Sequence, residues 1–331
     1  MQLPTDLQLA IEKFLAGSKP SQITRSFADL SGKYRAGALG QRCVQTSDDV
    51  VAYVATRMPS IYCVVRAICE EVSERLPQFR PRRLLDIGSG PGTALWAAQS
   101  VWGGLGSARM LDCNRVFREC GMSLSEYGTA PVFRQLAWET MDLEQPHRGF
   151  GDGCDLVTAC YVLSELSDAS RQRTVLAAWE AASGVLIVVE PGTPKGFETI
   201  LAARAALIDQ GAQILGPCAA GGACPMKGSA IRWCHFSERV ERTSWQRRGK
   251  GATLAFEDEK YSYVVASRLP ARQIAGRIVD VPRTSKFDIS INICDSQNQI
   301  GSFRVSKRDR ERFARFKRLK WGSYVPADQV K

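Results

Sequence analysis

The feature that most constrains the fold is the segment LLDIGSGPGT at 84–93, where an apolar stretch ends in an acid and glycines follow at 88, 90 and 92. Alternate glycines allow positive φ angles and let the backbone approach a ligand closely. The open N–H groups of the helix predicted over 93–102 would face that ligand. Asp112 ends the next predicted strand, about 20 residues further on, where an acid can take ribose hydroxyls. The segment therefore predicts a strand–turn–helix unit that binds a nucleotide-like cofactor.

Apolar strand patterns alternate with helical patterns from residue 81 onward. The predicted strands are 82–88, 107–113, 130–138, the start of 154–166, and 184–192. Strands separated by helices indicate a parallel sheet covered on both faces. A later segment, 260–268, is expected to add a strand to this sheet, and a β segment is expected over about 276–305.

Residues 1–80 are predicted to be helical. Ser47 and Asp48 are the predicted caps of one helix. Pro59 should kink that helix or begin a second one. The apolar residues at helical spacing are Val54, Met58, Ile61, Val65, Ile68, Val72 and Leu76.

The glycine spacing separates two classes of cofactor site. The pattern is D-x-G-x-G-x-G, which fits the dinucleotide fingerprint G-x-G-x-x-G poorly. It resembles motif I and the following acid of class I S-adenosylmethionine (SAM)-dependent methyltransferases, over roughly 80–200. That resemblance implies a Rossmann-like α/β fold and SAM as the cofactor. It implies SAM contacts from Asp86, Gly88, Ser89, Gly90, Gly92 and Asp112, with Asp112 at the ribose and Ser89 the weaker candidate.

The sequence supports a cofactor pocket better than a reaction. SAM carries the difficult chemistry of methyl transfer, so the protein mainly orients the nucleophile. The segment YVLSEL at 161–166 lacks the Asn/Asp-Pro-Pro-aromatic motif of amino-methylating enzymes, and the Pro-Cys motif of pyrimidine methyltransferases is absent. Glu165 and Glu190 are candidates for orienting a substrate, and an ordinary loop or capping acid is the competing interpretation of each. The catalytic residue stays unassigned.

Three cysteines gather in the loop CAAGGACPMKGSAIRWC at 218–234, with five and nine residues between them. Zinc ribbons pair their ligands at shorter spacing, so the loop is a poor ribbon. The loop has two interpretations: a metal site, or three loop cysteines that bind no metal. The fourth ligand could be His235 or a distant cysteine, and we prefer Cys294. It ends an alternating strand whose buried face is predicted to carry Phe287, Ile289, Ile291 and Ile293, and it has the opposite parity.

Several unusual motifs occur in an order that resembles one family. These are YVLSEL, VEPGTPKGF, GPC…ACPM…RWCHFSERVER, FEDEKYSYVVASR, INIC and VSKRDR with a later WG, within about 45–325. They resemble the Rsm-type methyltransferase-like family linked to the small ribosomal subunit, whose members are mitochondrial and bacterial. Other members tend to have Asn where this chain has Ser164. The resemblance implies a 4Fe–4S cluster on Cys218, Cys224, Cys234 and Cys294, with zinc as the alternative metal. It also implies association with small-subunit ribosomal RNA.

Net charge of +10 favours a polyanionic partner, with nucleic acid ahead of a membrane surface. Residues 301–331 hold ten Lys/Arg against three acids, and the tail is predicted to be helical from about 307. Trp233 and Phe236 are expected to pack beside the metal loop. A solvated surface competes with RNA binding for the basic residues. The predicted RNA contacts are Arg239, Arg242, Arg247, Arg248, Lys307, Arg308 and Arg310.

Four parts are expected: a helical region at 1–80, a SAM-binding domain at 81–215, a cysteine cluster region at 216–260, and a metal-clamped β segment with a basic tail at 261–331. No apolar run is long enough to span a membrane, and no signal pattern opens the chain. Its 11 cysteines are therefore expected to be reduced. We expect a cytoplasmic monomer, with the mitochondrial matrix as the alternative location.

The function predicted is a SAM-binding, iron–sulfur-containing factor that acts on the small ribosomal subunit, in assembly or translation. A catalytic rRNA methyltransferase is the first alternative. A small-molecule methyltransferase with a structural metal is the second, and it would not bind ribosomes.

Overall fold

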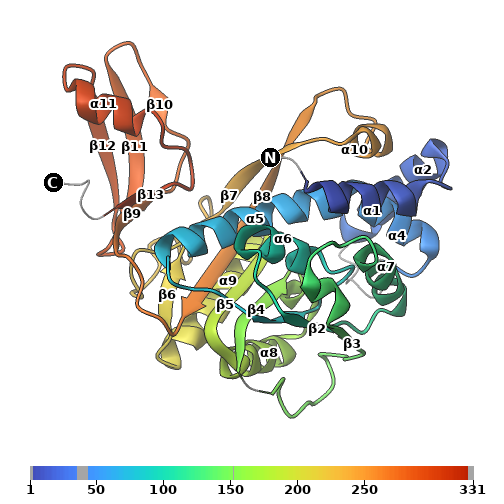
Figure 1. The fold of residues 1–331 in the computed structure, drawn as a ribbon. Helices are drawn as coiled ribbons and strands as arrows, with labels where there is room; N and C mark the ends of the chain where they lie inside the picture. The colour runs from blue at the N-terminus through green and yellow to red at the C-terminus, as the bar shows by residue number, and fades with distance from the viewer. Residues whose placement is uncertain (1–2, 36–43, 152, 327–331) are drawn as a thin grey trace.

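An eight-stranded sheet forms the centre of the computed structural model, which describes residues 3–35, 44–151 and 153–326 (Figure 1). Its strands are β1 (Arg83–Ile87), β2 (Ser107–Leu111), β3 (Leu136–Glu139), β4 (Cys154–Cys160), β5 (Ala182–Pro191), β6 (Gln213–Gly216), β7 (Phe236–Glu241) and β8 (Phe256–Ser267). They lie in the order β3-β2-β1-β4-β5-β8-β6, with β7 paired to β8. Strands β1 to β5 pair in parallel, and β8 runs antiparallel to its neighbours β5, β6 and β7. This order, with one reversed strand between β5 and β6, confirms the predicted class I methyltransferase fold and the added strand.

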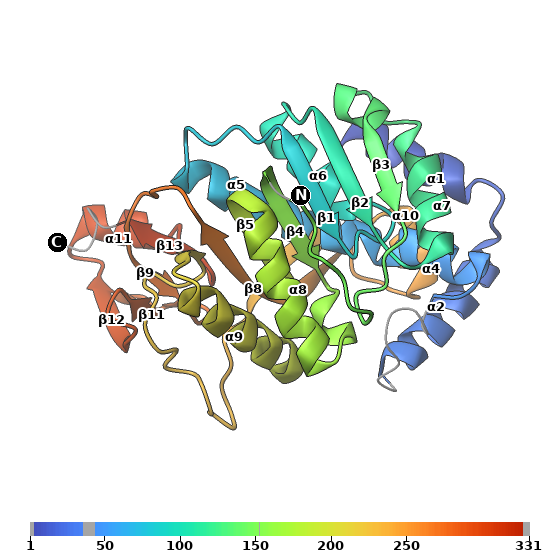
Figure 2. The ribbon, with the colours of Figure 1, turned by 90° about the horizontal axis from the view of Figure 1, so that it is seen from below.

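Helices cover both faces of this sheet. The helices of the main body are α1 (Thr5–Leu15), α2 (Pro20–Arg35), α4 (Ser47–Thr56), α5 (Met58–Arg75), α6 (Thr93–Trp102), α7 (Arg115–Ser125), α8 (Asp168–Ala181) and α9 (Pro194–Asp209). Figure 2 shows α8 and α9 lying across one face of the sheet, and α5 and α6 lie on the other. Strand β5 packs against both layers, because Val185, Ile187 and Val189 belong to one core and Leu186 and Val188 to the other. A parallel strand buried on both faces needs such an unbroken apolar run.

The N-terminal helices differ from the prediction in one detail. Pro59 lies in the first turn of α5 and so begins a second helix, one of the two predicted outcomes. Thr46, and not Ser47 or Asp48, caps α4, because its side chain accepts from the Asp49 amide while the Asp49 carboxylate bonds back to Thr46. The capping box places the helix start one residue earlier than predicted.

The third predicted strand is also shorter than expected. Its first half forms a 3-10 turn, Pro131–Arg134, and only Leu136–Glu139 pairs with β2. Proline has no N–H to donate to a strand ladder, which accounts for the late start of β3.

A second, smaller sheet follows β8 and projects away from the main body (Figure 1). Its antiparallel strands are β9 (Ile274–Ile278), β10 (Arg283–Thr284), β11 (Asp288–Asp295), β12 (Ile300–Ser306) and β13 (Tyr324–Pro326). The order is β10-β11-β9-β13, with β12 paired to β11. Helix α11 (Arg310–Phe316) packs on it, and Phe316 joins the core formed by Ile289, Ile291 and Ile293.

Two predictions for this region are corrected. Phe287 is 71% exposed, because β11 begins at Asp288 and leaves Phe287 in the preceding turn. Up to residue 326, where the described residues end, the tail is helical only over Arg310–Phe316 and then forms β13, so the helix is much shorter there than expected. Asp328 and Lys331, counted in the tail, lie outside the described residues.

Across residues 3–35, 44–151 and 153–326, none of the helices combines the length and the apolar character needed to cross a membrane.

Candidate functional site

The glycine turn joins β1 to α6 at the carboxyl edge of the large sheet. Gly88, Gly90 and Gly92 have φ angles of 65°, 52° and 84°, a region that L side chains rarely adopt. A Cβ at Gly88 would lie 2.4 Å from Val162 Cγ2, so this glycine is also required by packing. A Cβ at Gly90 would meet no described atom within 4 Å. Gly90 therefore borders open space where a ligand could approach the backbone.

Two acids flank this turn, one on each side. Asp86 is fully buried in β1, and its Oδ1 accepts a 2.7 Å hydrogen bond from the Thr158 hydroxyl of β4. Asp112 follows β2, and its two oxygens accept from the Gly90 and Asn114 amides, each at 2.7 Å. Burial raises the pKa of Asp86 to about 7 and also raises the pKa of Asp112. The predicted residues are thus brought together at one edge of the sheet.

Several polar atoms around the turn lack a partner among the described residues. They are Asp86 Oδ2, Ser89 Oγ and Thr93 Oγ1, all buried. Helix α6 also begins at Gly92 without a side-chain cap. Buried polar groups are normally satisfied, so these atoms and the free helix N-terminus fit a polar ligand such as SAM.

The next strand end carries a residue that sequence reasoning missed. Tyr161 directly follows β4 and has a φ angle of 61°, unusual for any residue but glycine. Its hydroxyl is buried without a partner in the described part of the chain. Strained backbone of this kind clusters at functional sites. The sequence signal that could have identified Tyr161 is its position directly after a strand of the parallel sheet.

The two acids proposed to orient a substrate occupy different environments. Glu190 is fully buried in β5, its Oε1 accepts from the Leu163 amide at 2.8 Å, and burial raises its pKa to about 7. Glu165 ends the short 3-10 turn Leu163–Glu165 and is half-buried. Glu190 is therefore built into the sheet beside the predicted cofactor edge, whereas Glu165 lies in the loop that follows.

The four cysteines predicted as ligands line one small cavity. Cys218, Cys224 and Cys234 come from the loop and Cys294 from β11, and the Arg277 side chain lines the same space. Burial raises the pKa of the Cys234 thiol, and the neighbouring Cys218 raises it further. Cys294, which was preferred because its parity on the strand is opposite to that of the buried residues, thus faces the loop.

Three elements hold this loop in place. Arg204 of α9 donates to the Ala220 and Gly222 carbonyls, at 3.0 and 2.7 Å. Ser262 of β8 donates to the Cys234 carbonyl at 2.9 Å. Arg277 of β9 donates to the Pro217 carbonyl at 2.8 Å. The loop is therefore fixed between the large and the small sheet.

Among the residues with described positions, no group of three or more His, Cys, Asp or Glu side chains is arranged to hold a metal ion. A single zinc would draw its ligand sulfurs to about 2.3 Å from one centre. A 4Fe–4S cluster would take each thiolate at a separate iron.

His235, the other candidate ligand, is engaged elsewhere. Its ring stacks on Trp233 at 4.9 Å and meets the edge of Trp321 at 4.8 Å between ring centroids. Trp233 Nε1 donates to the Gly192 carbonyl at 3.0 Å, and Phe236 is buried. Trp233 shares an apolar cluster with Cys224 and Cys294, which confirms its predicted place beside the loop, whereas Phe236 packs against Tyr261 and Tyr263 of β8.

The predicted RNA contacts fall into three settings. Arg247 and Arg248 are exposed on α10 (Ser244–Gly249), Lys307 and Arg308 are exposed between β12 and α11, and Arg310 is exposed at the start of α11. Arg239 is exposed but pairs with Asp258 at 2.8 Å. Six of the seven thus lie where a phosphate could reach them.

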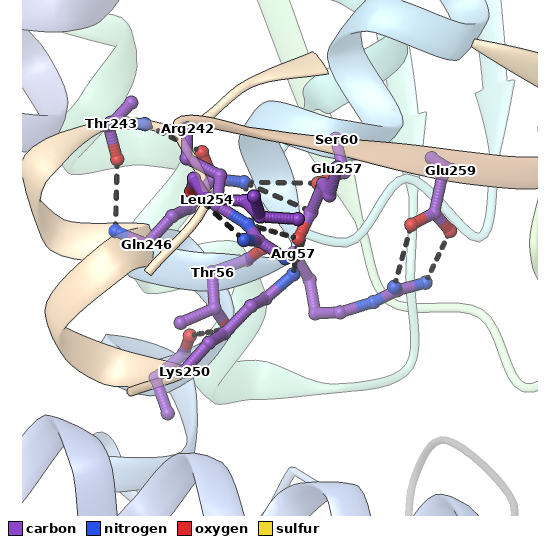
Figure 3. A network of polar contacts seen from close by, with 11 residues as sticks. Thr56, Arg57, Ser60, Arg242, Thr243, Gln246, Lys250, Leu254, Glu257 and Glu259 are labelled. Atoms are coloured by element: carbon purple, nitrogen blue, oxygen red, sulfur yellow. Dashed lines mark hydrogen bonds and ion pairs between the residues drawn. The ribbon is translucent and has the colours of Figure 1, made fainter. Parts of the chain in front are cut away.

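Arg242 differs from that expectation. Its side chain is 15% exposed and donates to Glu257 at 3.1 Å. Figure 3 shows the network around it, in which Glu257 also accepts from Ser60 and Lys250 and ties the segment between β7 and β8 to α5. Arg242 thus shares the Glu257 carboxylate with Lys250 and is largely buried, which makes it a poor RNA contact.

A family model described as "Mitochondrial small ribosomal subunit Rsm22" matches residues 47–326. The chain belongs to the Rsm22 family. The resemblance drawn from the motifs is thereby confirmed, and the match spans the glycine turn, all four cysteines and the small sheet.

Two curated relatives show the same relationship at low identity. The human "Ribosome assembly protein METTL17, mitochondrial" is 25% identical over 304 residues, covering 83% of this chain and 62% of that protein. The "Rsm22-cox11 tandem protein 2, mitochondrial" of Schizosaccharomyces pombe is 22% identical over 365 residues, covering 96% of this chain and 48% of that protein. This Rsm22-family chain therefore spans about half to three-fifths of the length of these relatives.

Solved structures also align with the Rsm22-family chain. An O-methyltransferase family protein from Burkholderia thailandensis has a TM-score of 0.45 and 12% identity, covering 76% of this chain and 73% of that one. The fold assignment itself rests on the strand order of the large sheet.

Proposed function

We propose that this Rsm22-family chain is a SAM-binding, iron–sulfur-containing factor that acts on the small ribosomal subunit, in its assembly or in translation. The family match over residues 47–326 carries the proposal, because it includes both the glycine turn and the basic small sheet. The relative named as a ribosome assembly protein is consistent with the assembly role.

SAM would bind at the glycine turn. Asp86, Ser89 and Asp112 supply polar groups, and the positive φ angles of Gly88, Gly90 and Gly92 open the backbone toward it. SAM, when bound, supplies an electrophilic methyl group. The residues of this chain bind and orient it, and Asp112 would have to share its bond to the Gly90 amide with the ribose.

A 4Fe–4S cluster would bind Cys218, Cys224, Cys234 and Cys294. The cavity that the four cysteines share supports a metal site there, and the choice of a cluster over zinc rests on the family resemblance. Because Cys294 belongs to the small sheet, the cluster would clamp that sheet to the loop, and metal binding would contribute folding free energy.

The small-subunit RNA would be held through the exposed cations already predicted, with Arg242 the weakest member of that set.

The division into four parts with boundaries at 80, 215 and 260 is retained as a proposal, although β8 continues across the last of these. A monomer in the cytoplasm was expected. The named relatives are mitochondrial and favour the matrix alternative, which cell fractionation would decide.

Catalytic rRNA methylation is the second candidate, favoured by the strained Tyr161 and the buried Glu190 beside the proposed SAM site. The test supplies tritiated-methyl SAM with small-subunit assembly intermediates. Tritium in the rRNA would establish catalysis, whereas ribosome binding without RNA label would favour a non-catalytic factor. Label in a small molecule, with no ribosome binding, would favour the small-molecule methyltransferase.

Filter binding to fragments of small-subunit rRNA across a salt series tests RNA binding directly. Neutralised phosphates release counterions, so affinity should fall steeply as salt rises. Binding that is flat in salt would contradict the proposed RNA role.

A further inference from the structure

The end of the small sheet presents an aromatic ring to solvent. Phe287 is 71% exposed in the turn between β10 and β11. This turn lies beside the one that joins β12 to α11, because the Lys307 amide donates to the Phe287 carbonyl at 2.8 Å. We call residues 285–287 and 307–310 together the distal tip. The distal tip therefore holds the large apolar side chain of Phe287 outside the hydrophobic core of the small sheet.

The backbone of the distal tip is fixed by local hydrogen bonds. The Ser285 hydroxyl oxygen accepts from the Phe287 and Asp288 amides, both at 3.0 Å. The Ser285 amide donates to the Asp288 carbonyl at 2.8 Å. A turn closed in this way holds the backbone of Phe287 in place, which lowers the entropic cost of using its ring to bind a partner.

Cations lie beside this ring and in the adjoining turn. Lys286 Nζ lies 5.8 Å from its centroid, and Lys307, Arg308 and Arg310 are exposed in the adjoining turn. Residues 274–326 hold twelve Lys/Arg against five Asp/Glu, so this short region accounts for most of the net charge of +10. The charge of the distal tip is therefore complementary to a polyanion.

The position of the distal tip leaves it free to reach a partner. Cys294 lies at the other end of β11, against the cysteine loop, so Phe287 stands about 24 Å from it at the usual rise of a strand. Figure 1 shows this end of the small sheet pointing away from the large sheet. An element that projects in this way can enter a groove or loop of a large partner.

We propose that the distal tip binds single-stranded RNA, with Phe287 stacking on an unpaired base and Lys286, Lys307 and Arg308 holding the neighbouring phosphates. Exposed aromatics flanked by cations bind single strands in this manner, and unpaired bases offer the faces that stacking requires. The inference rests on the proposed RNA-binding function, and it names a residue and an RNA class that the proposed function does not.

The test measures the affinity of the full chain for a fluorescein-labelled single-stranded oligouridine, by anisotropy at several salt concentrations. Phe287→Ala should weaken binding by about tenfold or more and leave the salt slope unchanged, because no charge is removed. Phe287→Tyr should bind like the wild type, because it keeps a ring. Phe303→Ala is the matched control, since Phe303 is a 43% exposed aromatic of the same sheet outside the tip, and its affinity should not change.

The outcomes separate this inference from the proposed function. A wild type that binds RNA with a steep salt slope, beside a Phe287→Ala variant of equal affinity, overturns the inference alone. A wild type that binds no RNA overturns the proposed RNA role as well. A third arm uses vesicles that contain an anionic lipid, because a ring among cations could also enter a membrane. Vesicle binding that depends on Phe287, with RNA binding independent of it, would overturn the RNA assignment.

Discussion

Gly90 holds a left-handed backbone conformation in open space, and this makes it a selective probe of the cofactor site. Gly90→Ala adds a methyl group that meets no described atom within 4 Å, so the loss of stability should be only about 1 kcal/mol, from the positive φ angle. The same methyl group would stand where SAM approaches the backbone. Calorimetric titration should therefore show SAM affinity falling by about tenfold or more.

Gly103 provides the control for this substitution. It ends the same helix, α6, with a φ angle of 66° and equally open surroundings. Gly103→Ala should lose similar stability and keep its SAM affinity. Equal SAM affinities for the two variants would remove Gly90 from the site.

Glu190 should make stability depend on pH. Burial raises its pKa from an ordinary 4.5 to about 7, so the folded chain keeps a proton that the unfolded chain releases near pH 4.5. The resulting stabilisation is fully present below that pH and is lost as the pH rises through about 7. The stabilisation lost over this pH range amounts to up to about 3 kcal/mol. Between about pH 5 and 8, the free energy of unfolding measured with denaturant should fall less for Glu190→Gln than for the wild type. Parallel curves would contradict the assignment.

At the residue scale, prediction from the sequence succeeded where local chemistry decides the outcome. The alternating glycines and the parity of Cys294 follow from backbone geometry and strand period alone. Phe287 was predicted to be buried because its parity matches that of the buried isoleucines of β11. The strand begins only at Asp288, one residue after Phe287. Arg242 could not be recognised as paired, because Glu257 reaches it only through the pairing of β7 with β8.

Between elements, Arg277 is the main polar connection of the small sheet to the rest of the chain. Its buried guanidinium, 3% exposed, donates to Glu71 of α5 and to the Pro217 and Gly322 carbonyls. Arg277→Met would leave Glu71 without its cation and should cost about 3–5 kcal/mol of unfolding free energy. Arg239→Met, at the exposed pair with Asp258, should change stability little. Similar losses in chemical denaturation would contradict the role given to Arg277.

Cys294 tests the proposed cluster at the same scale. Protein purified without oxygen should contain iron and sulfide, and Cys294→Ser should lose much of both together with thermal stability. Cys120→Ser is the control, because Cys120 is a buried core thiol of α7 and should leave the metal content unchanged. Zinc without sulfide would favour the alternative metal, and unchanged iron in Cys294→Ser would contradict the ligand assignment.

Elements with strong periodicity were predictable, and those set by distant contacts were not. The strands β5 and β8 follow from their apolar patterns, whereas β7, directly after the cysteine loop, was not predicted. The late start of β3 follows a 3-10 turn that begins at Pro131, and the end of α11 at Phe316 was not marked by the apolar pattern. The cysteine loop was recognised from composition, but its fixing by Arg204 and Arg277 required the three-dimensional arrangement.

The whole molecule combines a sheet of cofactor-binding type with a basic unit joined to it through the cysteine loop. Residues 274–326 concentrate positive charge on the side that projects from the large sheet (Figure 1). Reversing this charge, with Lys307→Glu and Arg308→Glu together, should weaken RNA binding and lower its salt slope by about two. Stability should hardly change, since both side chains are exposed. Filter binding and thermal unfolding check the two expectations, and an unchanged slope would contradict them.

The most direct measurement is sedimentation of the full chain with isolated small ribosomal subunits through a sucrose gradient, with and without SAM. Isolated large subunits in parallel gradients are the control. We predict that the chain moves with the small subunit and not with the large one, and that raised salt releases it. A chain that stays at the top of every gradient, or distributes equally between the two subunits, would contradict a role on the small ribosomal subunit.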